Sequence, residues 1–101
     1  MTLPITGLDD TVHQRVRLGI LAVLAEADMA EFTYLRDRLE VTDGNLNRHL
    51  QVLNTAGFVT IEKRVQGRRR TWVRATDSGR HALREHLGLL QEIIDATRGP
   101  L

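Results

Sequence analysis

The chain has 101 residues, of which 42% are hydrophobic, so its length fits one domain with a modest core. It has no cysteine, which excludes disulfides, thiolate metal sites and a cysteine nucleophile. The longest apolar run, residues 19–25, is far too short to span a bilayer, and the N-terminus lacks the features of a secretory signal. We therefore expect one domain over 1–101, cytoplasmic and without a membrane partner.

The net charge of +1 hides an uneven distribution along the chain. Residues 42–74 hold seven of the 14 basic residues but two of the 13 acidic ones. Thirteen of the basic residues are Arg, which forms paired hydrogen bonds with phosphates and guanine edges better than Lys does. This segment favours a nucleic-acid contact, and the alternative is a chance run of charge on a solvated face.

A first helix is predicted over residues 9–27. Asp9 and Asp10 favour its N-terminus through capping and through the helix dipole. Apolar residues recur every four positions, as in a helix that faces a core, at Val12, Val16, Ile20 and Leu24. Residues 30–32 then form an extended link or a one-bridge strand.

A helix-turn-helix is predicted over residues 33–57. Thr33 is a candidate N-cap for a short helix over 34–39, and Thr42 for the helix that follows. Gly57 stands where a left-handed residue would end that second helix. Two helices joined by so short a turn are typical of this motif.

The second helix of the motif separates apolar from polar residues. Its buried side is predicted to be Leu46, Leu50 and Leu53. Amides on the opposite face can pair with adenine and Arg with guanine, while the first turn offers backbone N–H groups to phosphate. The predicted DNA contacts on this helix are Thr42, Asp43, Gly44, Asn45, Asn47, Arg48 and Gln51. The alternative is that they are ordinary surface residues. We expect His49 to be partly buried and hydrogen-bonded rather than in contact with a base.

From Phe58 the apolar period changes from helical to alternating, which predicts a hairpin over residues 58–75. Its loop is placed at residues 66–69, where Gly67 can adopt a positive φ. Arginines at a hairpin tip have no role in a core, so phosphate contact is predicted for Arg64, Arg68, Arg69 and Arg70. Trp72 is expected to pack at the base of the hairpin more readily than to stack on a base.

A last helix is predicted over residues 77–97, with more apolar positions than one small core requires. A monomer would expose this surplus as a strip, so we expect a homodimer. The candidate dimer residues, on the first and last helices and before them, are Leu8, Val12, Val16, Leu83, Leu87, Leu90 and Ile94. A two-fold dimer would hold its recognition helices about 34–36 Å apart on one face of DNA.

The order of these elements resembles the winged-helix transcription regulators of the MarR and ArsR type, over about residues 8–90. The fold expected from both readings is mainly α with a small β-hairpin, a winged helix-turn-helix with extended N- and C-terminal helices. The residues that carry the resemblance are Arg17–Leu21, Thr42–Leu46 with Arg48–Leu50, Ala56–Val59, Gly67–Arg69 and Thr76–Arg80. It implies a dimeric bacterial or archaeal regulator whose second motif helix enters the major groove while the hairpin, or wing, touches the flanking backbone. Sibling members often carry Pro in the wing, whereas Arg70 and Thr71 stand here.

These observations predict a sequence-specific regulator, acting as a dimeric repressor on double-stranded DNA with a pseudo-palindromic operator. The alternative is a winged-helix interaction or dimerisation module without sequence-specific DNA binding. No enzyme, cofactor or metal is expected, because no catalytic motif is present and the spacing of His81, Glu85 and His86 differs from that of the metal sensors. The sequence names no small-molecule effector.

Overall fold

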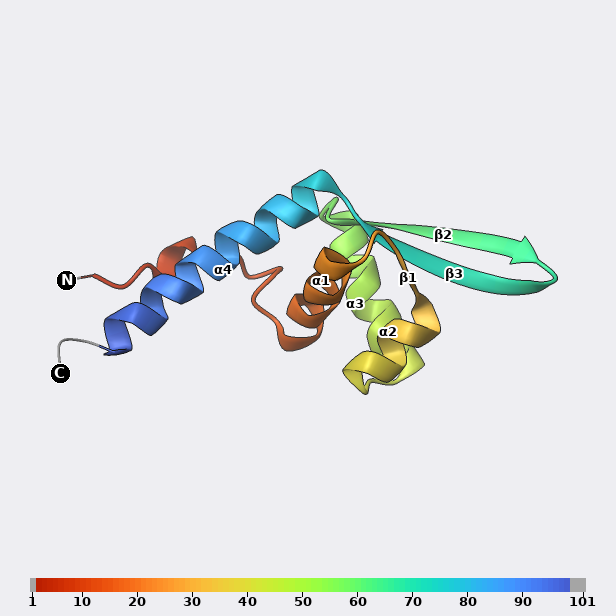
Figure 1. Cartoon of the computed structure of the whole chain (residues 1–101), viewed down its shortest axis with the longest axis horizontal. Helices are drawn as coiled ribbons and strands as arrows, with labels where there is room; N and C mark the ends of the chain where they lie inside the picture. Colours follow the sequence, from red (N-terminus) through yellow and green to blue (C-terminus); the bar gives the residue numbers. More distant parts are fainter. Residues whose placement is uncertain (1, 99–101) are drawn as a thin grey trace.

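The computed structural model describes residues 2–98, apart from the side chain of Gln66. Residues 1 and 99–101 of the predicted domain lie outside the described part. The molecule is elongated, 59 × 24 × 22 Å, with a hairpin projecting from one end and the last helix from the other (Figure 1). Its fold is the predicted winged helix-turn-helix. The elements are η1 (Ile5–Gly7), α1 (Arg15–Glu26), β1 (Ala30–Glu31), α2 (Phe32–Leu39), α3 (Asp43–Thr55), β2 (Val59–Gln66), β3 (Arg68–Ala75) and α4 (Asp77–Arg98).

Helix α1 begins at Arg15, later than the predicted start at residue 9. Gln14 is its N-cap, with an extended backbone and a side-chain oxygen that accepts from Val16 N at 2.9 Å. Asp9 does cap, but it caps a separate turn by accepting from Thr11 N at 2.8 Å. The prediction that Asp9 caps the first helix was therefore wrong, because Gln14 takes that position.

Helix α2 begins at Phe32, so the prediction that Thr33 caps a helix from residue 34 was wrong. The two residues of β1 pair with β3. Strand β1 then continues directly into α2, which has no side-chain cap. This short strand confirms the extended link, and it makes the sheet three-stranded and antiparallel with the order β1-β3-β2. The helix ends at Leu39, after which Glu40 takes a left-handed conformation with φ 55°.

Helix α3 has the boundaries that its capping residues predict. Thr42 Oγ1 accepts from Asn45 N at 3.1 Å, which satisfies one of the free donors of the first turn. The helix ends at Thr55, and Gly57 follows with φ 81°, a conformation that costs little without a Cβ. Both predictions are confirmed.

The core lies between α1, α3, the inner face of the sheet and the first half of α4. Leu46, Leu50 and Leu53 are all buried in it, as predicted. Val12, Val16 and Leu83 are also buried within the single chain, at 0%, 9% and 4% exposed. Although predicted as dimer residues, these three side chains pack within their own subunit and leave little surface for a partner: Val12 precedes α1, Val16 lies on α1 and Leu83 on α4.

The hairpin is tighter than predicted. Its strands run to Gln66 and Arg68, which pair with each other across Gly67 at φ 81°. The predicted loop over 66–69 is thereby reduced to one residue, and Arg68 and Arg69 belong to β3 together with Arg70, which was predicted to begin that strand. Strand residues alternate between the two faces of a sheet, so the arginines do not form one cluster.

Helix α4 spans nearly the predicted range and is fastened to the base of the wing. Thr76 Oγ1 donates to Gly57 O at 2.6 Å and accepts from Gly79 N at 3.0 Å, while Thr76 N donates to Phe58 O at 3.0 Å. Gly79 packs so closely that a Cβ there would lie 2.1 Å from Phe58 O. In the described part of the chain, no helix is long and apolar enough to cross a membrane.

Candidate nucleic-acid interface

Helix α3 presents a polar face to solvent. Asn47, Arg48 and Gln51 are exposed, while the leucines on the other side are buried. Gln51 Nε2 donates to Asn47 Oδ1 at 3.4 Å, so the two amides lie together one helical turn apart. Gly44 is exposed as well, and a Cβ there would meet no atom within 4 Å. Amide and guanidinium groups on one open helix face have the chemistry that reads base edges in the major groove.

The first turn of α3 is tied to α2 by an arginine that the sequence analysis did not single out. Arg36 donates to Asp43 Oδ1 at 3.1 Å and to Asp37 Oδ1 at 2.9 Å. Hydrogen bonds with the carboxylates of Asp37 and Asp43 raise the pKa of the Arg36 guanidinium above its usual range. Asp43 was predicted to contact DNA, but its carboxylate is engaged here with α2. An exposed pair of this kind contributes little stability and serves mainly to orient the two helices.

His49 lies beneath the exposed polar face of α3, which we call the reading face. Its side chain is 5% exposed and hydrogen-bonded, as predicted. Arg17 NH1 is 3.0 Å from His49 Nδ1, and Arg17 Nε also donates to Thr11 O at 2.6 Å. Burial lowers the pKa of His49, and the nearby charges of Arg17 and Arg48 lower it further. Arg17 was noted in the sequence as part of the family pattern, but its contact with α3 spans 32 positions and has no local signal.

The four predicted wing cations lie on two different faces. Register pairs Arg64 with Arg70, and strand alternation puts Arg68 and Trp72 on that same face. Arg69 faces the other way, opposite Val65, which is 68% exposed. Trp72 is half-buried and lines a shallow cavity of about 290 Å³ with Arg64, Arg68 and Arg70, so its ring packs among the wing arginines.

Two of these arginines already have acidic partners. Arg64 NH2 lies 2.8 Å from Glu62 Oε2, and Arg70 NH1 lies 3.9 Å from Glu31 Oε2 on β1. All four predicted wing arginines are exposed, and their ion pairs are surface pairs that exchange partners easily. A phosphate backbone can therefore compete for them.

The remaining predicted interface residues lie along α4 and before α1. Leu87 and Ile94 are 47% and 44% exposed, and Leu8 and Leu90 are half-buried. In the same helix His86 is 1% exposed and its Nε2 lies 3.0 Å from His13 Nδ1. Within residues 2–98, no three His, Asp or Glu side chains gather in a way that would hold a metal ion.

Comparison with known proteins identifies the family. Residues 16–94 match the model of a winged helix DNA-binding domain. An uncharacterized protein of Methanocaldococcus jannaschii is 42% identical over 73 residues, a match that covers 71% of this chain and 79% of the relative.

Solved structures agree with that match. A transcriptional regulator homologue from Pyrococcus horikoshii OT3 superposes with a TM-score of 0.83 at 34% identity, covering 86% of this chain and 87% of that one. The transcriptional regulator BldR from Sulfolobus solfataricus has the same fold, with a TM-score of 0.74 at 23% identity over 87% of this chain and 63% of its own. Regulators of this kind are not enzymes. The chain thus belongs to the winged helix DNA-binding domain family and is a DNA-binding transcription regulator.

Proposed function

We propose that the protein is a sequence-specific repressor that binds a pseudo-palindromic operator as a homodimer. The observation that carries this proposal is the polar face of α3. Asn47, Arg48 and Gln51 are exposed to solvent there, while Leu46 and Leu50 pack the helix against the core. In this arrangement α3 would enter the major groove, and the wing would contact the phosphates beside it.

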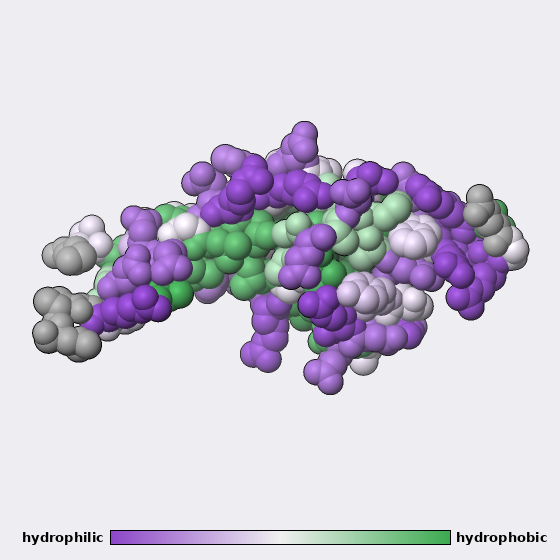
Figure 2. Space-filling model, in the orientation of Figure 1, coloured by the Kyte–Doolittle hydropathy of each residue, from purple (hydrophilic) through white to green (hydrophobic). Residues whose placement is uncertain are grey.

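The dimer part of the proposal rests on α4. Figure 2 shows an apolar band over this helix and the N-terminal segment, in contrast to the hydrophilic wing at the other end of the molecule. The exposed members of the band include Leu3, Ile5, Leu87 and Ile94. Soluble monomers rarely expose an apolar strip of this kind, so it suits a two-fold contact between copies of α4.

The repressor part follows from what such a dimer can do. Two recognition helices on one DNA face would be spaced by about one helical turn, roughly 34–36 Å. A dimer seated in this way occludes the promoter it covers without needing a further activity. Control by occlusion is therefore the simplest use of this surface.

Selection of bound sites from random DNA, followed by fluorescence anisotropy, tests the proposal. We expect an inverted repeat with half-sites about 10 base pairs apart and a dimer in light scattering at micromolar concentration. Retention on heparin without any selected sequence would contradict the operator reading and favour an architectural or interaction module. A monomer under the same conditions would contradict the dimer.

A further inference from the structure

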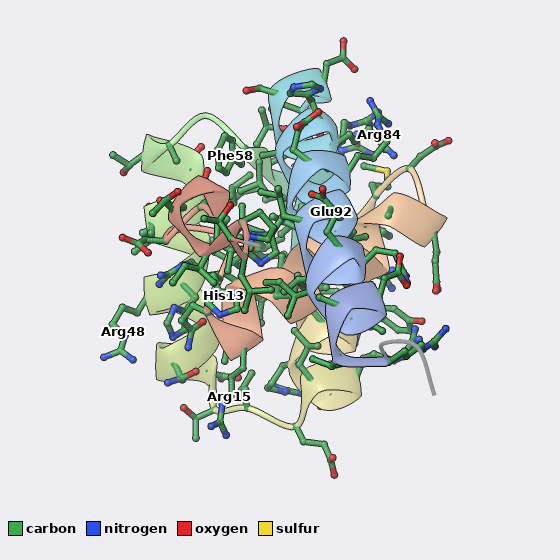
Figure 3. The ribbon with its side chains drawn as sticks, turned by 90° about the vertical axis from the view of Figure 1, so that its left-hand side faces the viewer. His13, Arg15, Arg48, Phe58, Arg84 and Glu92 are labelled. Carbon is green, nitrogen blue, oxygen red and sulfur yellow. The ribbon has the colours of Figure 1, made fainter. Side chains whose placement is uncertain are left out.

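A pocket opens beside α3, and none of its lining residues belongs to α4. Its volume is about 660 Å³, and it lies between the start of α1, the turn after α2 and the first two turns of α3. Figure 3 shows Arg15 and Arg48 extending on this side of the molecule, whereas Arg84 lies on the opposite side of α4. The lining residues are Gln14, Arg15, Val16, Leu39, Glu40, Val41, Thr42, Asn45, Arg48 and His49.

His49 is buried in the wall of this pocket between two guanidinium groups. Its Nδ1 is 3.0 Å from Arg17 NH1, and its Nε2 is 3.5 Å from Arg48 NH2. A neutral imidazole has one accepting nitrogen, and a guanidinium can donate but never accept. One of these two contacts therefore is not a hydrogen bond.

The distances decide which one. A separation of 3.0 Å is normal for a hydrogen bond, whereas 3.5 Å is beyond the usual range. Nδ1 therefore accepts from Arg17, and the proton of the imidazole is on Nε2. His49 Nε2–H and Arg48 NH2 are then two donors that lie side by side with no acceptor for the Nε2 proton.

The charges around the pocket favour an anion. Arg15 and Arg48 line it, and Arg17 lies behind the imidazole, while Glu40 is the carboxylate among the lining residues. An oxygen that accepts from both His49 and Arg48 would satisfy the buried donor and offset the positive charge of the arginines. Phosphate oxygens bind in this way to convergent donors.

We propose that His49 Nε2–H, Arg48 and Arg15 form an oxyanion site that takes a phosphodiester of the DNA backbone, an inference that rests on the proposed function. The same chemistry would accept free inorganic phosphate. In the DNA-bound state, His49 is a contact residue beneath the reading face, and Arg17 is a positioning residue that fixes its tautomer.

The test follows the imidazole nitrogens of His49 by ¹⁵N NMR in the full-length protein. We expect the Nε2–H tautomer in the free protein and a rise in the pKa of His49 on adding operator DNA, because a phosphate offsets the two arginines. Inorganic phosphate alone is titrated as a second arm. A response to DNA and not to phosphate up to millimolar concentrations assigns the site to the backbone, and a response to phosphate alone assigns it to a free anion.

Variants supply an independent readout of DNA affinity. His49→Leu should weaken binding about tenfold, whereas His49→Gln, which keeps an N–H donor near the same place, should retain most of it. Arg15→Ala should weaken binding and lower the salt slope by about 1, and Glu40→Gln should strengthen it. Arg84→Ala is the matched control, with no expected change.

The two hypotheses fail in different ways. If wild-type protein binds no DNA, the proposed function fails, and the phosphate arm still tests the pocket. If wild-type protein binds DNA but His49→Leu and Arg15→Ala bind equally well, the oxyanion site is wrong and the regulator stands. An Nδ1–H tautomer in the free protein would also overturn the site.

Discussion

Helix α3 and the wing differ in how firmly they are held. The helix is attached to the rest of the chain by three buried leucines and by the Arg17–His49 contact. The outer half of the wing extends beyond the body, and its ion pairs are exposed (Figure 1). Reading bases needs side chains fixed to within a fraction of an ångström, whereas phosphate contact tolerates movement. We therefore expect specificity to reside in α3 and sequence-independent affinity in the wing.

The largest expected effect concerns the contact of α4 with Phe58, which lies between α3 and the wing. Gly79→Ala should destabilise the protein by about 3 kcal/mol or more, because its Cβ would collide with the backbone carbonyl of Phe58. Gly88→Ala in the same helix is the control, and it should stabilise by about 0.5–1 kcal/mol since its Cβ meets nothing within 4 Å. Urea unfolding measures both. Equal midpoints for the two variants would refute the close packing of α4 on the wing base.

Gln51→Ala tests the specificity of α3. We expect a loss of about 1–3 kcal/mol in discrimination at one base position in each half-site, with the other positions unchanged. Asn54→Ala, exposed in the last turn of the helix rather than in its first turns, should have no such effect. Competition anisotropy with single-base operator variants provides the measurement. A uniform loss across all sequences would show that Gln51 does not read a base.

The wing should behave in the opposite way. Replacing Arg68 and Arg70 with Ala should weaken binding to all sequences alike and lower the slope of log K against log salt by about 1 for each lost contact. The selected sequence should not change. Anisotropy at several salt concentrations measures the slope, and an unaltered slope would show that these arginines do not reach the backbone.

Acid should loosen the helical body and spare the wing, which contains no histidine. Burial lowers the pKa of His86, and His13 lowers it further, although Asp9 acts in the opposite direction. Because the unfolded chain then binds more protons, stability should fall as the pH drops below about 6.5 and continue falling to the folded pKa. Urea midpoints between pH 7.5 and 5.5 check this fall. The fall in stability should be smaller in His86→Leu. An identical fall in both proteins would show that His86 does not cause it.

Gly44→Ala should have the smallest effect on the fold. The new Cβ meets nothing within 4 Å, so the helix should gain about 0.5–1 kcal/mol. DNA affinity should fall at the same time if the backbone of α3 approaches the groove closely at this point. Thermal unfolding and anisotropy on the same sample separate the two. An unchanged affinity would place Gly44 outside the DNA contact.

The sequence predicted those features that local chemistry determines. The Thr42 cap, the Gly57 stop and the inward leucines of α3 all act within a few residues, and each was correct. Features that depend on distant partners were missed or misassigned. The start of α2 depends on the pairing of β1 with β3, and the burial of Val12 and Leu83 depends on which apolar stripes meet in the core. The link between Arg17 and His49 has no sequence pattern at all.

The central claim is that the polar face of α3 enters the major groove. Replacing purines of the operator with their 7-deaza analogues removes only a major-groove acceptor, and anisotropy then reports which positions matter. We predict losses of affinity at matching positions in two half-sites about 10 base pairs apart, absent in Gln51→Ala at the position that Gln51 reads. Affinity that is indifferent to every 7-deaza substitution would contradict the claim.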